Sequence, residues 1–291
     1  FPTYRAIIKQ ANAAALDNTH GLQAPYSREP SPCTIVYEDF RAIYAGDMKN
    51  HSGSSRKGFW LKARKDDPLI GTDEILVHSP AYHDGPVSFL RYQYAMWLSS
   101  LLGEAAGVSR PAAFARNTAA LAGYLDYLPA SREICSAWFG DEYPEVFKNA
   151  DYLSDAFGMY TNNYDGGMKK TVYAGVNNKR QGLDPEDDYT PVYKIAKAAS
   201  TTDDYQYVRR MQAVVDIRNW ALYFSIAGLF GDIDHYGYYW VHNYYVYVPR
   251  HDRARLMFHD MDGMFSDGAG VRWPCGGGPF PHPVPTRMFC S

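Results

Sequence analysis

Several features that would settle the class of this protein are missing from its sequence. No run of about 18 apolar residues occurs, so we expect no helix that spans a membrane. The 29 Lys and Arg residues do not outnumber the 32 Asp and Glu residues, and the net charge is −3. Because no basic excess is present to neutralise phosphates, we expect no nucleic-acid partner. No internal repeat is found, and 291 residues with 46% hydrophobic content suffice for one large domain or two ordinary ones.

Cysteine is also scarce. The four cysteines lack a C-x-x-C pair that would suggest zinc, and they could form two disulfides; they are Cys33, Cys135, Cys275 and Cys290. One glycosylation sequon, at residues 50–52, and 25 tyrosines add weak support for a secreted or surface location. Four free thiols in a cytosolic protein are the alternative. The chain begins at Phe1 without an initiator methionine or a signal peptide, so we expect a processed chain or an excerpt.

Hydrophobic periodicity predicts a mixture of strands and helices. Leu90, Tyr94, Trp97 and Leu101 fall on one stripe of the clearest helix, and Asp216 is expected to cap another. Residues 158–204 are polar and are expected to form loops with a short helix. The expected helices are 7–15, 86–107, 203–215 and the helix after residue 216; the expected strands are 33–40, 57–65, 73–79, 112–117, 123–128, 242–248 and 253–260.

The stretch from residue 216 to 265 carries most of the chemistry. A capped apolar helix is followed by a polar loop with Asp234, then Asn243, a hairpin, and Asp260. Phosphoryl transfer needs a carboxylate that orients the attacking hydroxyl, and Asn and Asp oxygens that hold Mg²⁺ against the phosphates. Asp234, Asn243 and Asp260 occupy this order, which predicts a phosphoryl-transfer site.

Six segments together resemble the spore coat protein H (CotH) kinase family of atypical protein-kinase-like proteins. The resemblance spans about residues 45 to 265, and the last 50 of these residues are specific as a set. The segments are "GSSRKGFWLK" (53–62), "DGPVSFLRYQYAMWL" (84–98), "LAGYLDYL" (121–128), "DIRNWALYFSIAGLFG" (216–231), "GDIDHYGYYWVHNYYVY" (231–247) and "HDMDGMF" (259–265).

The resemblance implies an α+β, atypical protein-kinase-like fold with a small strand-rich N-terminal lobe and a more helical C-terminal lobe. We expect four parts along the chain. They are an N-terminal extension at 1–45, an N-lobe-like part at 46–130, a C-lobe-like part with the acidic site at 131–265, and a Gly/Pro-rich tail at 266–291.

The resemblance also implies a set of site residues, with ATP and Mg²⁺ or Mn²⁺ as cofactors. Asp234 would be the catalytic residue that orients the hydroxyl. Asp262 precedes a glycine and is equally typical of a turn, and Lys57 and Lys62 compete for one phosphate contact. The implied metal ligands are Asn243, Asp260 and Asp262, and the implied nucleotide contacts are Lys62, Lys57 and Arg91.

The implied function is an ATP- and Mg²⁺-dependent protein Ser/Thr kinase that acts on a surface or secreted protein. The alternative is a non-catalytic extracellular structural or adhesion protein on the same fold, with a surface-assembly partner or further copies of itself; a metal-dependent hydrolase ranks third. The Tyr-rich composition, the possible disulfides, the missing Glu and the short tail favour the alternative. Two departures from the family pattern lie at the site. His259 stands where the family has Trp, and the Glu expected after the Gly-Tyr strand has no clear match, with Asp126 lying nearby.

Overall fold

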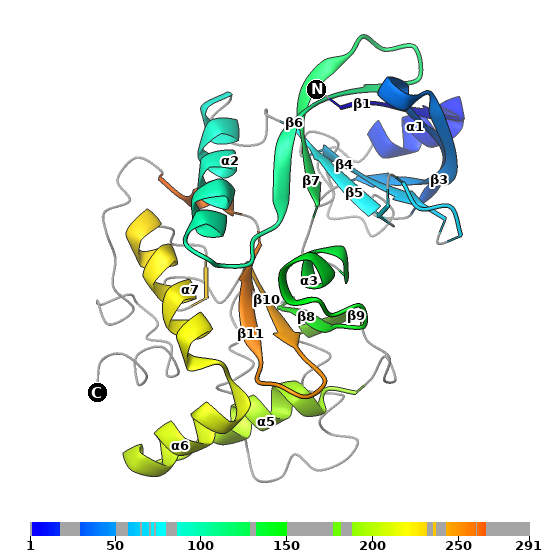
Figure 1. The fold of residues 1–291 in the computed structure, drawn as a ribbon. Coiled ribbons are helices and arrows are strands. Elements are labelled where there is room, and N and C mark those ends of the chain that lie inside the picture. The colour runs from blue at the N-terminus through cyan, green and yellow to red at the C-terminus, as the bar shows by residue number, and fades with distance from the viewer. Residues whose placement is uncertain are drawn as a thin grey trace. The chain divides into compact units, whose positions relative to one another are not determined.

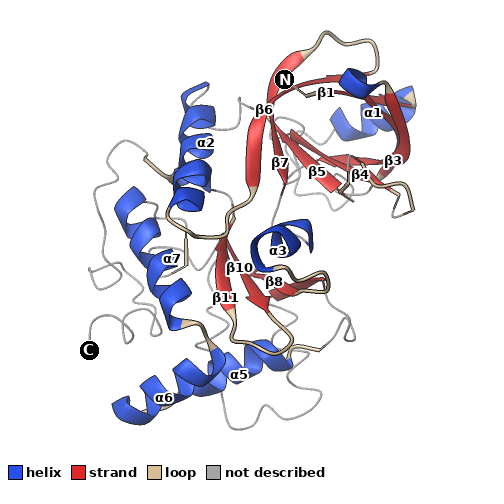
Figure 2. Cartoon of the chain, in the orientation of Figure 1, coloured by secondary structure: helices blue, strands red, loops and turns tan. Residues whose placement is uncertain are grey.

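The described residues form a mixed α+β structure in two compact units, which confirms the predicted class (Figures 1 and 2). The first unit comprises residues 1–93 and 107–129, and the second comprises 94–106 and 130–291. The computed structural model describes residues 2–17, 30–50, 58–64, 66–69, 71–72, 74–79, 86–128, 132–149, 177–181, 188–231, 235–236, 243–259 and 261–265.

Seven strands of the first unit close into a barrel in the order β1-β2-β3-β4-β5-β7-β6. Neighbouring strands are antiparallel except at the seam, where β1 pairs with β6 in parallel. The stretch expected as an N-terminal extension, 1–45, supplies β1, β2 and the start of β3. The strands are β1 (Thr3–Ile8), β2 (Ser31–Tyr37), β3 (Ala42–Asn50), β4 (Gly58–Ala63), β5 (Glu74–His78), β6 (Val108–Arg116) and β7 (Ala122–Leu128).

Alternation of side chains along the strands builds the barrel core. On β4, Phe59, Leu61 and Ala63 are buried in the core cluster, whereas Lys62 is exposed. This is the period-2 pattern of a strand with one buried face, so the predicted strand at 57–65 is confirmed. The strand predicted at 73–79 and the hairpin of 112–117 with 123–128 are confirmed as β5 and as β6 with β7.

Two predictions in the first 101 residues are wrong in detail. The helix expected at 7–15 is preceded by β1, which runs to Ile8, and α1 covers Gln10–Asp17. The helix expected at 86–107 is present as α2 but ends at Leu101 (Pro86–Leu101), and its apolar stripe is exposed. The opposite side, with Tyr92 and Met96, is the buried one. The exposed fractions of the stripe residues are 69% for Leu90, 51% for Tyr94, 55% for Trp97 and 62% for Leu101.

The second unit contains an antiparallel sheet in the order β11-β10-β8-β9 and four further helices. Helix α7 packs on β11, and Phe139 of α3 stacks on Tyr247 of β10 with 4.7 Å between ring centroids. The predicted helix at 203–215 and the hairpin of 242–248 with 253–260 are confirmed. The elements are α3 (Arg132–Phe139), β8 (Glu145–Asn149), β9 (Asn177–Gln181), α5 (Thr190–Ala199), α6 (Asp204–Val214), α7 (Ile217–Phe230), β10 (Tyr244–Val248), β11 (Arg255–Phe258) and the 3₁₀ turn η5 (Met261–Gly263).

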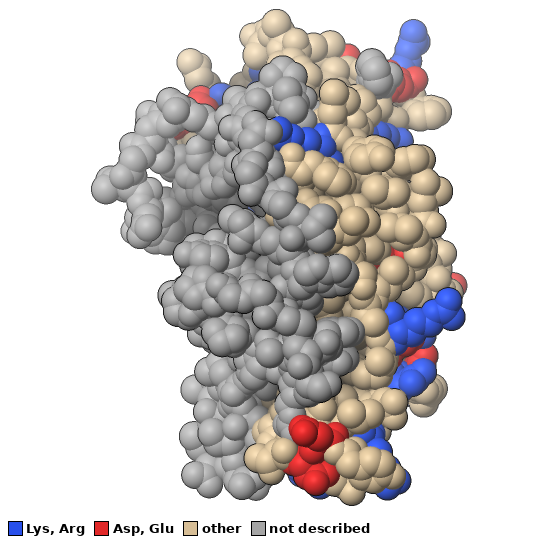
Figure 3. Space-filling model, turned by 90° about the vertical axis from the view of Figure 1, so that its left-hand side faces the viewer, with Lys and Arg blue, Asp and Glu red and all other residues tan. Residues whose placement is uncertain are grey.

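The described cysteines revise one expectation drawn from composition. Cys33 and Cys135 are free thiols, so the suggestion of two disulfides is wrong; Cys275 and Cys290 lie outside the described residues. Within the described part of the chain, no helix is long and apolar enough to cross a membrane. On the face shown in Figure 3, the described Lys and Arg side chains lie in small groups separate from one another.

Candidate functional site

The predicted site residues differ in how much of them the structure describes. Asp234, Asp260 and Lys57 lie outside the described residues, and for Asp262 only the backbone is described, within η5. Three predicted side chains are described in full: Asn243 in the second unit, and Lys62 and Arg91 in the first.

Helix α7 carries the polar loop that begins after Gly231, and its start is capped as predicted. The Asp216 carboxylate accepts hydrogen bonds from the backbone N–H groups of Arg218 and Asn219 at 3.2 and 3.3 Å, and it contacts Arg255 of β11 at 3.3 Å. Gly231 ends the helix with φ 70°, a left-handed conformation that glycine adopts without a Cβ clash. Partial burial raises the pKa of Asp216, but the Asn219 N–H and Arg255 outweigh this and hold it below its usual value.

Asn219, one turn into α7, fixes the helix against β11. Its side-chain oxygen accepts a hydrogen bond from the N–H of Leu256 at 2.7 Å, and its Nδ2 donates to the Leu256 carbonyl at 3.2 Å. The same Nδ2 lies 3.0 and 3.1 Å from the two carboxylate oxygens of Glu104, which is fully buried. One amide therefore ties the α7 helix, strand β11 and residue 104 together.

Glu104 and Asn219 were not singled out as site-building residues from the sequence. Asn219 does stand in the quoted motif "DIRNW", and its position after a helix cap is the available signal. Glu104 stands between Gly103 and two alanines, where a lone acid in a small-residue stretch could have suggested burial. Burial raises the pKa of Glu104 well above its usual value, against the hydrogen bond from Asn219.

The start of β10 and the end of β11 meet at the candidate site. Tyr244 pairs with Phe258, so Asn243 and His259 are the next residues along the two strands. Asn243 is 1% exposed and has φ 51°, a left-handed conformation that Asn tolerates better than most residues. The Tyr223 ring of α7 stacks on Phe258 at 4.2 Å, which holds the end of β11 against the helix.

His259, the residue directly before Asp260, is almost fully buried and has a cationic neighbour. Lys148 Nζ of β8 lies 2.8 Å from His259 Nε2 and 5.9 Å from the centroid of the Tyr245 ring. Because an ammonium group can only donate, the ring nitrogen accepts and the imidazole is neutral in this arrangement. The Tyr245 and His259 rings meet edge to face at 4.8 Å. At the position where the family has Trp, this chain therefore has His259 in a cluster with Lys148 and Tyr245.

Lys62 and Arg91 belong to the first unit. Lys62 is exposed on β4, and its cross-strand partners are Asp47 on β3 and Glu74 on β5. Asp126, which stands near the position of the expected Glu, is buried in the barrel, where it accepts hydrogen bonds from Tyr4 Oη at 2.6 Å and Arg110 Nε at 2.9 Å. Asp126 is therefore committed to a contact that links three strands.

The donor chemistry at the end of the hairpin fits a hard cation. The Asn243 amide is buried at the start of β10, and in the sequence Asp260 and Asp262 follow His259 after the end of β11. Oxygen donors of this kind are the ligands that Mg²⁺ prefers, usually with one or two carboxylates and substrate phosphates.

The match to a known family falls on this region. No curated protein matches the chain. The family model described as "CotH kinase protein" matches residues 143–278, which include Asp234, Asn243, Asp260 and Asp262 but not Lys57, Lys62 or Arg91. The match bears out the resemblance inferred from the sequence motifs. The matched segment, residues 143–278, is similar to the CotH kinase family and covers a little under half of the chain.

Proposed function

We propose that the protein is an ATP- and Mg²⁺-dependent phosphotransferase with a protein-kinase-like fold that phosphorylates Ser or Thr on a protein. The observation that carries this proposal is the CotH kinase match over residues 143–278. It encloses Asp234, Asn243 and Asp260 in the order that phosphoryl transfer requires. In the sequence, Asp234 follows the capped helix α7, Asn243 precedes β10, and Asp260 follows β11.

Each residue has a role in the proposed reaction. Asp234 accepts a hydrogen bond from the attacking hydroxyl and orients it toward the terminal phosphate. Asn243 and Asp260 hold the metal, Asp262 supports the turn or the metal, and Lys62 or Lys57 together with Arg91 contact the phosphates. Mg²⁺, when bound, neutralises charge that develops on the transferred phosphoryl group. The link from Asn219 to β11 keeps the start of α7 in register with the strand that leads to Asp260.

The proposal is tested by incubating the protein with γ-labelled ATP and Mg²⁺ or Mn²⁺, with casein as a generic acceptor. We expect metal-dependent transfer, either to the acceptor or to the protein itself. Asp234→Asn should reduce the rate at least about a hundredfold, since it removes the group that orients the hydroxyl. Asp260→Ala should abolish the metal-dependent transfer. Glu142→Ala, which alters an exposed acid before β8, is the matched control and should leave the rate unchanged.

Binding of a fluorescent ATP analogue separates the outcomes. Transfer that survives Asp260→Ala would refute the assigned metal site. A wild-type protein that binds no nucleotide with Mg²⁺ or Mn²⁺ would refute the phosphotransferase proposal and would favour the non-catalytic structural role.

A further inference from the structure

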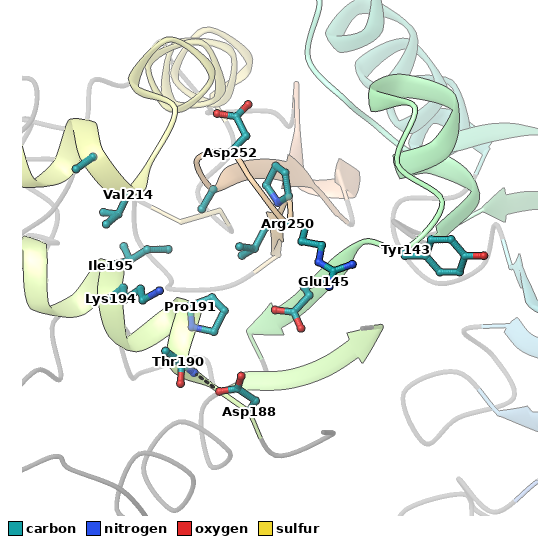
Figure 4. A pocket seen from close by; sticks show the side chains of 14 residues that line it. Tyr143, Glu145, Asp188, Thr190, Pro191, Lys194, Ile195, Val214, Arg250 and Asp252 are labelled. Atoms are coloured by element: carbon teal, nitrogen blue, oxygen red, sulfur yellow. Dashed lines mark hydrogen bonds between the residues drawn. The ribbon is translucent and has the colours of Figure 1, made fainter. Parts of the chain in front are cut away.

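A hollow in the second unit lies away from the candidate site. It has a volume of about 350 Å³ and is lined by the start of β8, the first turns of α5, the end of α6 and the turn between β10 and β11 (Figure 4). Val248 and Pro249 line it, whereas Asn243 stands at the other end of β10. Five strand residues at about 3.3 Å each separate the two places by roughly 17 Å. We refer to this hollow as the hairpin-turn pocket.

The floor of the hairpin-turn pocket is apolar. Ile195 of α5 and Ala254, next to β11, are 1% and 2% exposed, and Pro191, Val214 and Val248 lie around them. A hollow of this size takes one large aliphatic or aromatic side chain and part of its neighbours. Burial of such a side chain is favourable in proportion to the apolar area that it removes from water, so the pocket can anchor a short segment.

Two cations stand at the rim of the pocket. Lys194 comes from α5 and Arg250 from the turn between β10 and β11, and both side chains are exposed (Figure 4). Neither makes an ion pair or a side-chain hydrogen bond within the part of the chain that the structure describes. Both charges are therefore available to a ligand.

The acidic side chains of the lining are already engaged. Asp252 pairs with Arg255 at 2.7 Å and with Arg253 at 3.6 Å. Asp188 accepts a hydrogen bond at 2.9 Å from the N–H of Thr190, the first residue of α5. Glu145 also has a partner of its own. Among the charged side chains of the lining, Lys194 and Arg250 are the two without an ion-pair or hydrogen-bond partner in the described part of the chain, and they favour a negatively charged partner.

We propose that the hairpin-turn pocket binds an acidic peptide segment that inserts one large apolar side chain between Lys194 and Arg250. The apolar floor holds the side chain, and the two cations pair with carboxylates on either side of it. In the proposed phosphotransferase the pocket is a docking site for the protein substrate. That use rests on the proposed function, whereas the peptide binding does not.

The distance between the hairpin-turn pocket and the candidate site limits which substrates can occupy both at once. An extended chain spans at most about 3.3–3.6 Å per residue. A segment docked in the hairpin-turn pocket therefore needs at least about five residues between its apolar anchor and a Ser or Thr that reaches the candidate site. Substrates with a shorter spacing would gain nothing from the pocket.

The test uses fluorescence anisotropy of two fluorescein-labelled peptides with the 291-residue protein and no ATP. One peptide is Gly-Glu-Glu-Leu-Phe-Glu-Glu-Gly, and in the other every Glu is replaced by Lys. We expect the acidic peptide to bind at least about tenfold more tightly than the basic one, because opposite charges at a rim favour association. The double variant Lys194→Glu with Arg250→Glu should reverse this preference. That reversal cannot arise from misfolding.

A pocket-filling variant supplies the second arm. Ala213→Trp places a large ring at an exposed lining position on α6, and Gln212→Trp places the same ring at the neighbouring exposed position outside the lining. Ala213→Trp should weaken binding of the acidic peptide about tenfold or more, while Gln212→Trp should leave it unchanged. Asp260→Ala should bind the peptide like the wild type, so a failed kinase assay and a failed docking assay remain separate results. The proposal is overturned by equal binding of the two peptides, by an unchanged preference in the double variant, or by equal effects of the two Trp variants.

Discussion

At the scale of single residues, Glu104 is the most unusual group in the second unit. It is fully buried, and its described hydrogen-bond partner is the Asn219 amide. Burial raises its pKa well above the usual value, whereas Asn219 and Arg255 favour the charged form. The folded protein therefore keeps a proton on Glu104 at pH values where the unfolded chain releases it.

This proton makes stability depend on pH. Between the ordinary pKa near 4.5 and the raised pKa, the folded state binds more protons than the unfolded state, so the free energy of unfolding falls as pH rises. The slope from one group is at most about 1.4 kcal/mol per pH unit. We expect Glu104→Gln to flatten this dependence and to be more stable than the wild type at pH 8. Urea unfolding of both proteins from pH 5 to 8 measures how the free energy of unfolding depends on pH.

Glu142→Gln is the control for this experiment because its side chain is exposed. It should keep the slope of the wild type. If Glu104→Gln keeps that slope as well, the carboxyl is not protonated in the folded protein and the buried contact with Asn219 has to be interpreted as charged.

At the scale of elements, the start of α7 is the best-fixed point of the candidate site. Asp216 caps the helix and pairs with Arg255, while Asp203 caps α6 at an exposed position through the N–H of Gln206 at 2.8 Å. Loss of an Asp cap typically costs about 0.5–2 kcal/mol. We expect Asp216→Ala to cost about 2 kcal/mol, near the top of that range, and Asp203→Ala about 1 kcal/mol.

Thermal and urea unfolding of the two variants give the comparison. Asp216→Asn keeps a good capping residue but removes the charge, so it should recover most of the loss at neutral pH. Below pH 4 the wild type and Asp216→Asn should converge, since the lowered pKa of Asp216 contributes stability that is lost as the carboxylate becomes protonated. Equal costs for Asp216→Ala and Asp203→Ala would contradict a special role for the pair with Arg255.

Local signals predicted the elements around the candidate site well. The cap at Asp216, the helix at 203–215 and the hairpin of 242–248 with 253–260 depend on neighbouring residues, and each is present as α7, α6, and β10 with β11. The match of residues 143–278 to the CotH kinase model covers the last three of the quoted motifs, which lie at 216–231, 231–247 and 259–265. The roles of Asp234 and Asp260 stay predictions, because they lie outside the described residues.

Features that depend on distant contacts could not be predicted in the same way. The parallel pairing of β1 with β6 joins residues more than 100 positions apart, and no local pattern specifies it. Helix α2 is apolar on more than one side, so periodicity identified a stripe but could not tell that the opposite side is buried. The burial of Glu104 depends on Asn219, which lies 115 positions away in the chain.

At the scale of the whole molecule, the chain passes between its two compact units more than once. Residues 94–106 belong to the second unit although they stand between two stretches of the first. Each unit contains one described free thiol, Cys33 in the first and Cys135 in the second. Burial is the main cause that raises the pKa of each thiol to about 12, with a further contribution from nearby carboxylates. Neither thiol should react quickly in the folded protein, because the thiolate is the reactive form.

The two thiols therefore report separately on the stability of the two units. Asp126→Ala removes the carboxylate that Tyr4 and Arg110 share across β1, β6 and β7, and leaving the buried Tyr4 hydroxyl without its acceptor costs about 1–3 kcal/mol. We expect this variant to speed iodoacetamide labelling of Cys33 at pH 8 and to leave Cys135 nearly unchanged. Asp216→Ala should do the reverse, since it weakens the second unit alone. Peptide mapping by mass spectrometry gives both rates, and parallel acceleration of both thiols in either variant would mean that the two units open as one.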